Sequence, residues 1–318
     1  MSSTLQVFIR SITAEAAGVL SFELRPMDGS PLPAFTAGAH IDLHLPGGLV
    51  RSYSLLNPQE ERHRYLVAIQ RDPQGRGGSH AAHELRVGQQ VEISRPRNNF
   101  PLDEAAPHSV LVAGGIGITP LWSMAQRLES LGRSWELYYC ARTRAQAALL
   151  EPIQQLPPAA RARVHLHFDH EPGGRVLDLA ELLARHPAGT HFYCCGPAGM
   201  LQAFQQCTAD RPRECVHLEY FSNGKEAASS GGFSVQLARQ GLSLSVPAGQ
   251  TILQTLLDAG VDVPHSCLDG VCGSCEVRVL AGEPDHRDLV LGPEEQARND
   301  RMMICCSGCK GESLVLDL

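Results

Sequence analysis

The 318-residue sequence contains no uninterrupted run of about 18 apolar residues, the minimum for a membrane-spanning helix. Its first residues, MSSTLQVFIRSITAE, lack the basic and then apolar segments of a secretory signal peptide. Positive charge is not in excess, since the formal net charge is −7, and this disfavours nucleic acid as a partner. Internal repeats are also missing. We therefore expect a cytoplasmic globular protein that binds neither membranes nor nucleic acids.

The composition is that of an ordinary globular protein, with 43% hydrophobic and 19% charged residues, and the length allows two or three domains. Cysteine is the exception. Eleven cysteines without a secretion signal indicate metal or redox use in a reducing compartment rather than disulfides. Four of them show no ligand spacing and are expected to be small buried side chains: Cys140, Cys194, Cys207 and Cys215.

The most specific motif places three cysteines in one loop and a fourth in a separate segment. Cys267, Cys272 and Cys275 have the spacing C-x4-C-x2-C, and Cys305 follows later in the chain. This is the pattern of plant-type [2Fe–2S] clusters, in which four thiolates hold two irons. The glycines at 270 and 273 would let the loop turn and direct backbone amides at the sulfurs.

A zinc ribbon is the alternative, because two pairs have the spacing of zinc knuckles: Cys272/Cys275 and Cys306/Cys309. Cys267 fits only the cluster pattern, so we favour iron–sulfur. Because two cysteines are adjacent at 305 and 306, spacing alone does not select the fourth ligand.

Residues 1–103 predict an antiparallel β-barrel, because short strands alternate with stretches rich in proline and glycine. The expected strands are Leu5–Ser11, Val19–Arg25, His40–Leu45, Ser52–Leu55, Tyr65–Gln70 and Gln90–Ser94.

Two segments of this barrel suggest a phosphate site. In Arg51-Ser52-Tyr53-Ser54 the first and third side chains share one face and the two serines the other. The glycine-rich Gly75-Arg76-Gly77-Gly78-Ser79 is expected to open a short helix, Ser79–Leu85, with Ser79 as its N-cap. Such a turn offers N–H groups to a phosphate, and Arg51 could supply the paired charge. The alternative is a surface cation beside a flexible turn.

Residues 104–223 predict a parallel α/β domain that binds a nucleotide. The buried strand Ser109–Ala113 runs into Gly114-Gly115-Ile116-Gly117-Ile118-Thr119-Pro120 and then a helix, with Thr119 expected as N-cap. A second strand, His191–Cys194, leads into Cys195-Gly196-Pro197-Ala198-Gly199. Ligands of such sheets bind at the carboxyl ends of the strands, where both glycine turns belong.

Two further groups in this domain carry weaker signals. Asp169, after the expected strand Val164–Phe168, could hold a ribose 2′-hydroxyl and so favour NADH, although Arg142 and Arg144 leave NADPH open. His165 and His167 share a strand face. Because no cysteine or carboxylate is positioned beside them in the sequence, we expect ordinary sheet histidines rather than a metal site.

The C-terminal part begins with a small, polar stretch, 224–232, which we interpret as an interdomain linker. Residues 233–318 predict a β-grasp domain that carries the cysteine loop. Its expected elements are the hairpin Phe233–Arg239/Leu242–Val246, the helix Ile252–Ala259 between Thr251 and Gly260, the strand Ser274–Leu280 and the last strand Ser313–Leu318.

These motifs, in this order, resemble the phthalate dioxygenase reductase family, which includes vanillate O-demethylase reductases, over essentially the whole chain. The matching segments are Arg51–Leu55, Gly75–Ser79, Gly114–Pro120, Cys195-Gly196-Pro197, Glu219-Tyr220-Phe221 and the cluster cysteines. The resemblance implies a multidomain protein with a flavin barrel, a parallel α/β nucleotide domain and a ferredoxin domain. It also implies that the flavin is FMN, which the motifs alone do not distinguish from FAD.

The resemblance also implies roles for single residues. Arg51 and the turn Gly77–Ser79 would hold the FMN phosphate, and Tyr53 would contact the flavin and its ribityl chain. Ser54 would lie near flavin N5, and the strand from Ile69 to Arg71 would offer its backbone to the ring edge.

For the nucleotide, the resemblance implies that Gly115, Gly117 and Thr119 receive the NADH phosphates. Cys195, with Gly196 and Pro197 in the same turn, would sit near the nicotinamide, and Phe221 beside the isoalloxazine. Cys305 is preferred as the fourth cluster ligand because Met302-Met303-Ile304-Cys305 is similar to the family's fourth-ligand segment.

The expected function is electron transfer from NADH through FMN and the cluster to a partner, a Rieske-type aromatic-ring oxygenase or O-demethylase. One alternative is a reductase for another acceptor, such as a haem monooxygenase. A non-enzyme alternative is a zinc-stabilised or redox-sensing binding module. Since one chain would carry all three cofactors, it could work as a monomer.

Overall fold

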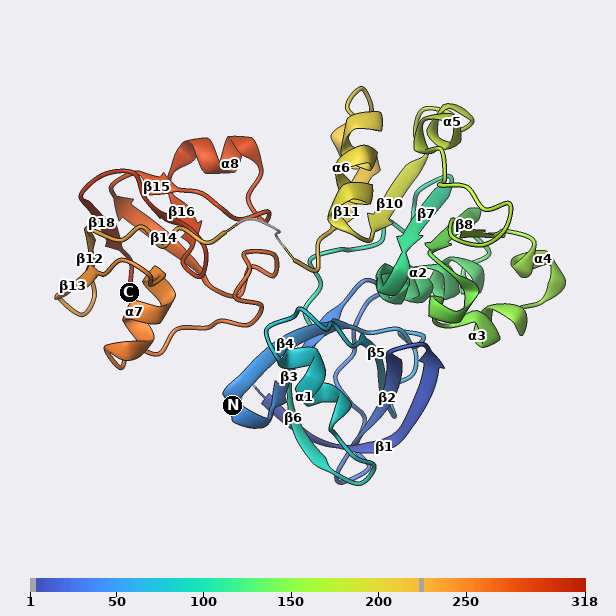
Figure 1. Ribbon diagram of the computed structural model, residues 1–318, viewed down its shortest axis with the longest axis horizontal. Coiled ribbons are helices and arrows are strands. Elements are labelled where there is room, and N and C mark those ends of the chain that lie inside the picture. Colours follow the sequence, from blue (N-terminus) through green and yellow to red (C-terminus); the bar gives the residue numbers. More distant parts are fainter. Residues whose placement is uncertain (1–3, 223–225) are drawn as a thin grey trace. The chain divides into compact units, whose positions relative to one another are not determined.

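The computed structural model describes residues 4–222 and 226–318 (Figure 1). The chain divides into two compact units, Met1–Glu219 and Tyr220–Leu318. The first unit contains an antiparallel sheet followed by a parallel one, and the second contains a mixed sheet. This is the predicted fold class. The boundaries predicted at 103, 223 and 232 remain predictions. Within the described residues, none of the helices is long and apolar enough to cross a membrane.

The antiparallel sheet closes into a barrel. Its strands are β1 Thr4–Ala16, β2 Val19–Pro26, β3 His40–Leu45, β4 Leu49–Ser54, β5 Tyr65–Gln70 and β6 Gln90–Ser94, in the order β4-β3-β6-β1-β2-β5. A bridge from Leu55 to Val67 joins the two terminal strands. Alternate side chains such as Val7, Ile9 and Ile41 fill the interior, as the two-residue period of a strand requires.

The parallel sheet has the order β11-β10-β7-β8-β9. Its strands are β7 Ser109–Gly114, β8 Trp135–Ala141, β9 Val164–Phe168, β10 His191–Cys195 and β11 Val216–Glu219. The connecting helices are α2 Ile118–Ser130, α3 Leu150–Gln154, α4 Pro158–Arg161, α5 Leu179–Ala184 and α6 Ala198–Cys207. The chain moves outward from β7 to β9 and then returns to the other side of β7. The strand order therefore reverses between β7 and β10, where open α/β sheets bind their ligands.

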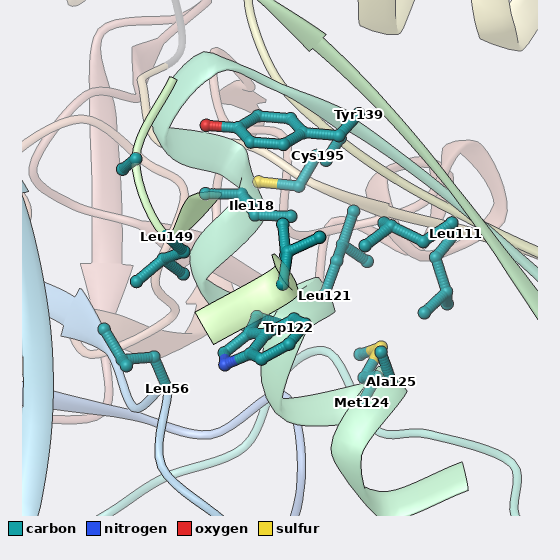
Figure 2. Packing of buried hydrophobic residues seen from close by; sticks show 14 of the residues in the cluster. Leu56, Leu111, Ile118, Leu121, Trp122, Met124, Ala125, Tyr139, Leu149 and Cys195 are labelled. Carbon is teal, nitrogen blue, oxygen red and sulfur yellow. The ribbon is translucent and has the colours of Figure 1, made fainter. Parts of the chain in front are cut away.

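A single hydrophobic core joins the barrel to the parallel sheet. Leu56, which follows the barrel strand β4, packs in the same cluster as Leu121 and Trp122 of α2 (Figure 2). Phe100, between the two sheets in sequence, belongs to this cluster as well. The shared core explains why both sheets fall in one compact unit.

The second unit is a β-grasp domain, as predicted. Its strands β12 Phe233–Leu237, β13 Leu242–Val246, β14 Glu276–Ala281, β16 Arg301–Met303 and β18 Ser313–Leu316 form the order β13-β12-β18-β14-β16. The helix α7 Ile252–Asp258 begins where Thr251 Oγ1 accepts a hydrogen bond from the amide of Gln254 (3.2 Å), and Gly260 follows with φ +77°. The sequence did not predict α8 Pro293–Arg298 or the small ribbon of β15 Pro284–Asp285 and β17 Gly308–Cys309.

Both glycine-led helices begin earlier than predicted. Gly117, not Thr119, is the N-cap of α2, because Gly115–Gly117 already forms a 3-10 turn that continues into the helix. Gly77 (φ +81°), not Ser79, is the N-cap of α1 Gly78–His83. Between β8 and α3, the 3-10 turn Arg144–Gln146 forms.

The predicted linker is only partly described. Gly224 and Lys225 lie outside the described residues. Further along, the amide of Ala228 donates to the carbonyl of Cys306 (2.7 Å), and the carbonyl of Ser229 accepts from the amide of Gly249 (2.8 Å). Residues 228 and 229 therefore belong to the packed second unit and are not a free connection.

Candidate functional site

The structure brings Arg51 and the glycine turn of the barrel together. A Cβ atom on Gly78 would lie 2.5 Å from Arg51 Cγ and 2.7 Å from its Nε, so only glycine leaves room for the arginine. The guanidinium also donates to the carbonyl of Arg76 (3.1 Å). Ser79 Oγ accepts from the amide of Asp72 (3.0 Å), which fixes the other side of the turn. A cation held against a glycine-rich turn fits a phosphate group.

The other side chains of this motif point to alternate faces, as predicted. Tyr53 is partly buried against the barrel core, and this burial raises the pKa of its phenol to about 12, so the phenol stays protonated. Ser54 is 5% exposed. Ser52 Oγ donates to Asp42 Oδ1 (2.8 Å), and Asp42 also pairs with Arg97 (2.6 Å). Ser52 is thus committed to a polar network of the barrel wall.

The segment from Ile69 to Arg71 lies at the C-terminal end of the barrel strand β5. The carbonyl of Ile69 lies 2.9 Å from His83 Nε2, and the amide of Arg71 donates to the carbonyl of Gly18 (2.8 Å). In an antiparallel pair, the N–H and C=O groups of one residue point towards the partner strand and those of the next residue point away from it. The backbone of Gln70, between them, therefore points away from β2 and is the part of this segment that a ring edge could meet.

The two glycine turns of the parallel sheet touch at the switch point between β7 and β10. A Cβ atom on Gly117 would lie 2.2 Å from the carbonyl oxygen of Cys195, and one on Gly114 would lie 2.6 Å from Pro197 Cδ. Gly196 is equally close, since its own Cβ would lie 3.0 Å from the Cα of Gly114. Gly115, with φ +55°, faces open space. The predicted nucleotide turns thus form one continuous backbone surface.

Thr119 is placed in the first turn of α2, where it is 1% exposed and its hydroxyl donates to the carbonyl of Ile116 (3.0 Å). The hydroxyl therefore stabilises the turn rather than facing solvent.

Cys195 lies at the end of β10 with its thiol in the core beside Ile118 and Tyr139 (Figure 2). Its sulfur is 3.9 Å from Glu219 Oε2, because Cys195 and Glu219 are paired in the register of β10 and β11. Part of the Glu219 side chain reaches the surface, but its carboxyl is withdrawn from water, and this burial raises its pKa to about 8. Burial likewise raises the pKa of the Cys195 thiol. This pair of an uncharged thiol and an uncharged carboxyl was not predicted from the sequence, although Glu219 lies in the segment Glu219-Tyr220-Phe221.

Asp169 and Phe221 are less directly placed. Asp169 follows β9, so β8 separates it from the switch point, and its Oδ1 is buried without a partner among the described residues. Burial and then the nearby Asp169 carboxylate raise the pKa of Cys140 to about 12. Phe221 belongs to the second unit and is 42% exposed.

The second unit gathers the four predicted cluster cysteines. All four are at most 8% exposed: Cys267, Cys272, Cys275 and Cys305. The Cys267 thiol interacts with the thiols of both Cys272 and Cys305, and its sulfur accepts from the amide of Asp269 (3.3 Å). Gly270 and Gly273 have φ +66° and +74°, which lets the loop turn as predicted. Buried thiols with amides directed at sulfur fit an iron–sulfur cluster.

The adjacent cysteines of the fourth-ligand segment contact each other and differ in their other partners. Cys305 reaches the Cys267 thiol, whereas the Cys306 sulfur fills the space beside Gly270, 2.3 Å from where a Cβ atom would stand. Cys306 also lies 3.8 Å from both the Met303 carbonyl and Ser307 Oγ. Cys309 is in β17, where its sulfur accepts from the amide of Gly311 (3.3 Å). This arrangement favours Cys305 as a ligand and does not resemble paired zinc knuckles.

The comparisons with known proteins agree with this geometry. Residues 235–310 match the family described as "2Fe-2S iron-sulfur cluster binding domain", and residues 111–206 match "Oxidoreductase NAD-binding domain". The chain is 53% identical to "Phenoxybenzoate dioxygenase subunit beta" of Ectopseudomonas oleovorans, over 98% of this chain and 96% of that one. It is 51% identical to "Tetrachlorobenzoquinone reductase" of Sphingobium chlorophenolicum, over 99% and 98%.

Two solved structures share its architecture. The structure of phthalate dioxygenase reductase, described as modular for electron transfer from pyridine nucleotides to [2Fe–2S], matches with a TM-score of 0.78 and 40% identity, over 99% of this chain and 98% of that one. The chain belongs to the phthalate dioxygenase reductase family. It is therefore an oxidoreductase, with NADH as electron donor and FMN and one [2Fe–2S] cluster as cofactors. An intact type IV self-sufficient cytochrome P450 monooxygenase also matches, with a TM-score of 0.85 and 38% identity, over 99% of this chain and 41% of that one.

Proposed function

We propose that this phthalate dioxygenase reductase-family protein is the reductase component of a two-protein oxygenase system. It would deliver electrons from NADH to a Rieske-type aromatic-ring oxygenase or O-demethylase. The observation that carries this proposal is the presence, in one chain, of a barrel with Arg51 against a glycine turn, an NAD-binding domain and four buried cysteines in the cluster pattern. When bound, FMN supplies the exchange between two-electron and one-electron transfer that a one-electron cluster requires.

In the barrel, Arg51 would bind the FMN phosphate together with the amides of Gly77, Gly78 and Ser79. Its position against Gly78 supports this role, since the guanidinium is already oriented over the turn. Tyr53, kept protonated by burial, would contact the flavin as a neutral hydrogen-bonding aromatic. Ser54 would lie near flavin N5, and the strand from Ile69 to Arg71 would border the ring through Gln70.

At the switch point, the backbone of Gly115 and Gly117 would bind the NADH diphosphate, with Thr119 holding the shape of the turn. Cys195 and Glu219 would sit near the nicotinamide. Because the thiol and the carboxyl are both uncharged, they would stabilise neither a positive nor a negative charge beside them. Asp169 would bind a ribose 2′-hydroxyl of NADH. Positioning of the two reacting rings supplies much of the rate in hydride transfer, so these residues would act mainly by orientation.

In the second unit, Cys267, Cys272, Cys275 and Cys305 would bind the two irons. The amide of Asp269, which donates to the Cys267 sulfur, would stabilise a thiolate and so affect the cluster potential. Phe221 would stand next to the flavin ring. We also propose that the chain works as a monomer, since it would carry all three cofactors itself. A cytosolic location suits its eleven cysteines, none of which forms a disulfide.

The relatives also suggest two other acceptors, a quinone and a haem protein. One relative is named a tetrachlorobenzoquinone reductase, and one matching structure is a cytochrome P450 monooxygenase. A quinone is small enough to take electrons without a protein docking surface. A haem or Rieske partner must instead receive them one at a time from the cluster.

The experiment that tests the proposal measures NADH oxidation with three acceptors: a Rieske-type oxygenase, a haem monooxygenase and a chlorinated quinone. The oxygenase arm should show reduction of the partner's cluster and product formation, and both should be lost in Cys305→Ser while NADH-dependent flavin reduction remains. If only the quinone is reduced, and Cys305→Ser reduces it at the wild-type rate, the oxygenase proposal is wrong. If only the haem monooxygenase is reduced and forms product, a haem protein replaces the Rieske-type oxygenase as the proposed partner.

A further inference from the structure

A cluster of histidine and carboxylate side chains lies at the edge of the parallel sheet opposite to the nucleotide turns. His108 immediately precedes β7, Glu136 is near the start of β8, and His186 lies in the segment that leads from α5 into β10. The nucleotide turns follow the other ends of the same strands, which lie side by side in Figure 1. With six residues in β7 and about 3.3 Å per residue, roughly 20 Å separate the two edges.

The three side chains converge. One ligand atom from each of His108, Glu136 and His186 lies within 4.8 Å of the others, and His108 Nε2 is 3.6 Å from Glu136 Oε1. The two imidazole rings are stacked with their centroids 5.3 Å apart. Around tetrahedral zinc, with bonds of about 2.0–2.1 Å, neighbouring ligand atoms are roughly 3.3 Å apart. Side-chain rotations that turn the edges of the stacked rings towards Glu136 would bring all three atoms to a common ion.

Neighbouring hydroxyls already orient two of these ligands. Ser134 Oγ is 2.8 Å from His108 Nδ1, which leaves Nε2 for the cluster. The Tyr138 hydroxyl donates to Glu136 Oε2 (2.6 Å), which leaves Oε1 on the His108 side. Hydrogen bonds to the second atom of a ligating histidine or carboxylate are characteristic of metal sites, because they fix the orientation of the ligand.

The third side chain has an unused ring nitrogen. His186 Nε2 is buried and finds no hydrogen-bond partner within the described parts of the chain. The neighbouring Arg185 and Arg211 have other partners, since Arg185 pairs with Glu181 and Arg211 donates to the carbonyls of Leu183 and His186. The buried Nε2 atom of His186 is thus available to a ligand.

His165, which we expected to be an ordinary sheet histidine, does have a carboxylate beside it in space. His165 Nε2 lies 3.7 Å from Glu136 Oε2, because β8 and β9 are adjacent in the sheet. His165 faces Glu136 Oε2, the oxygen that accepts the hydrogen bond from Tyr138. Its ring also stacks on the tyrosine ring, with centroids 4.5 Å apart. It therefore supports the cluster from outside rather than completing it.

We propose that His108, Glu136 and His186 form a binding site for a zinc-class divalent cation, separate from the electron-transfer cofactors. Two imidazoles and one carboxylate match the ligand types that Zn²⁺ prefers, and three protein ligands leave one position for water. The ion would join β7, β8 and the segment before β10 at the sheet edge. The site does not depend on the proposed redox function.

The test uses the full holoprotein, freed of adventitious metal by dialysis against a chelator and then titrated with Zn²⁺ alone against a chromophoric zinc indicator. X-ray absorption at the zinc edge identifies the ligand atoms from their bond lengths to zinc. Histidine nitrogen and carboxylate oxygen lie at about 2.0–2.1 Å, and thiolate sulfur lies at about 2.3 Å. Iron absorbs at a different edge and does not interfere. We expect one equivalent of zinc with a nitrogen/oxygen shell.

Two variants and one control complete the test. His108→Ala/His186→Ala should abolish this binding, and Glu136→Gln, which keeps the shape of the side chain, should weaken it at least roughly tenfold. His170→Ala removes an exposed histidine of the same domain and should change nothing. A sulfur shell, unchanged zinc affinity in Glu136→Gln, or no stoichiometric binding by the unmodified holoprotein would each overturn the proposal.

Discussion

The carbonyl oxygen of Cys195 occupies the place where a side chain on residue 117 would begin, 2.2 Å from the Cβ position of Gly117. This contact joins the turn after β7 to the turn after β10, two segments far apart in the sequence. Since both turns end at the switch point of the parallel sheet, the backbone that would bind the NADH diphosphate is shaped by the close approach of Cys195 to glycine.

Gly117→Ala should therefore separate the two turns. We expect a rise in the KM for NADH, or a fall in the rate of flavin reduction, of roughly tenfold to a hundredfold, because displacements near 1 Å have such effects on positioned reactants. Flavin and iron contents should stay unchanged. Stopped-flow reduction by NADH measures the rate. Gly199→Ala, in the first turn of α6 just after the second glycine turn and with open space at its Cβ position, is the matched control and should behave as the unmodified protein.

Gly78→Ala should displace Arg51, because the new methyl group would stand 2.5 Å from Arg51 Cγ. We expect FMN to bind roughly tenfold or more weakly, in line with the loss of a charged hydrogen bond of about 1.5–3 kcal/mol. Fluorescence of released FMN on dilution measures this. In the control Gly75→Ala, the methyl group meets only the flexible Asp72 side chain, at 3.1 Å, and FMN should be retained. Equal retention by Gly78→Ala would contradict the assignment of Arg51.

Cys305→Ser should lose the iron–sulfur cluster, whereas Cys306→Ser should keep it. The basis is the contact of Cys305 with the Cys267 thiol, whereas Cys306 contacts Cys305 and packs beside Gly270. Iron and sulfide analysis and the electron paramagnetic resonance signal of the reduced protein measure cluster content. The reverse outcome would assign the fourth ligand to Cys306.

Glu219 should make folding stability depend on pH. Its pKa in the fold is about 8, raised from 4.5 by burial, so the folded state holds a proton that the unfolded state has lost between these values. Stability should thus fall as pH rises from about 5 to 8 and level off above, as proton linkage requires. In Glu219→Gln this slope should disappear, together with an infrared carboxyl band that titrates near pH 8. The exposed Glu214→Gln is the control. A slope that persists in Glu219→Gln would mean that Glu219 is ionised in the fold.

The sequence predicted the local elements well because their signals are local. Alternating side chains identified barrel strands such as His40–Leu45, and the cap Thr251 identified its helix. The glycine-led helix starts were misplaced because the 3-10 turn at Gly115 forms against β10, a contact that no short window of sequence contains. The elements α8 and the ribbon β15/β17 were missed because they are too short to show a period.

The same distinction applies to the site. The cysteine loop was recognised from its spacing, which is a local property. The pairing of Cys195 with Glu219 depends on the register between β10 and β11, and the position of Glu136 beside His165 depends on that between β8 and β9. Such cross-strand neighbours follow from sheet order, which a single sequence does not reveal.

The central claim is that one chain carries electrons from NADH through a flavin to an iron–sulfur cluster. An anaerobic NADH titration, followed by visible absorption with flavin and iron assayed on the same sample, tests it most directly. The account predicts one FMN and two irons per chain, with flavin and iron–sulfur bands both bleached by NADH. Bleaching of a flavin alone, with zinc in place of iron, would contradict it.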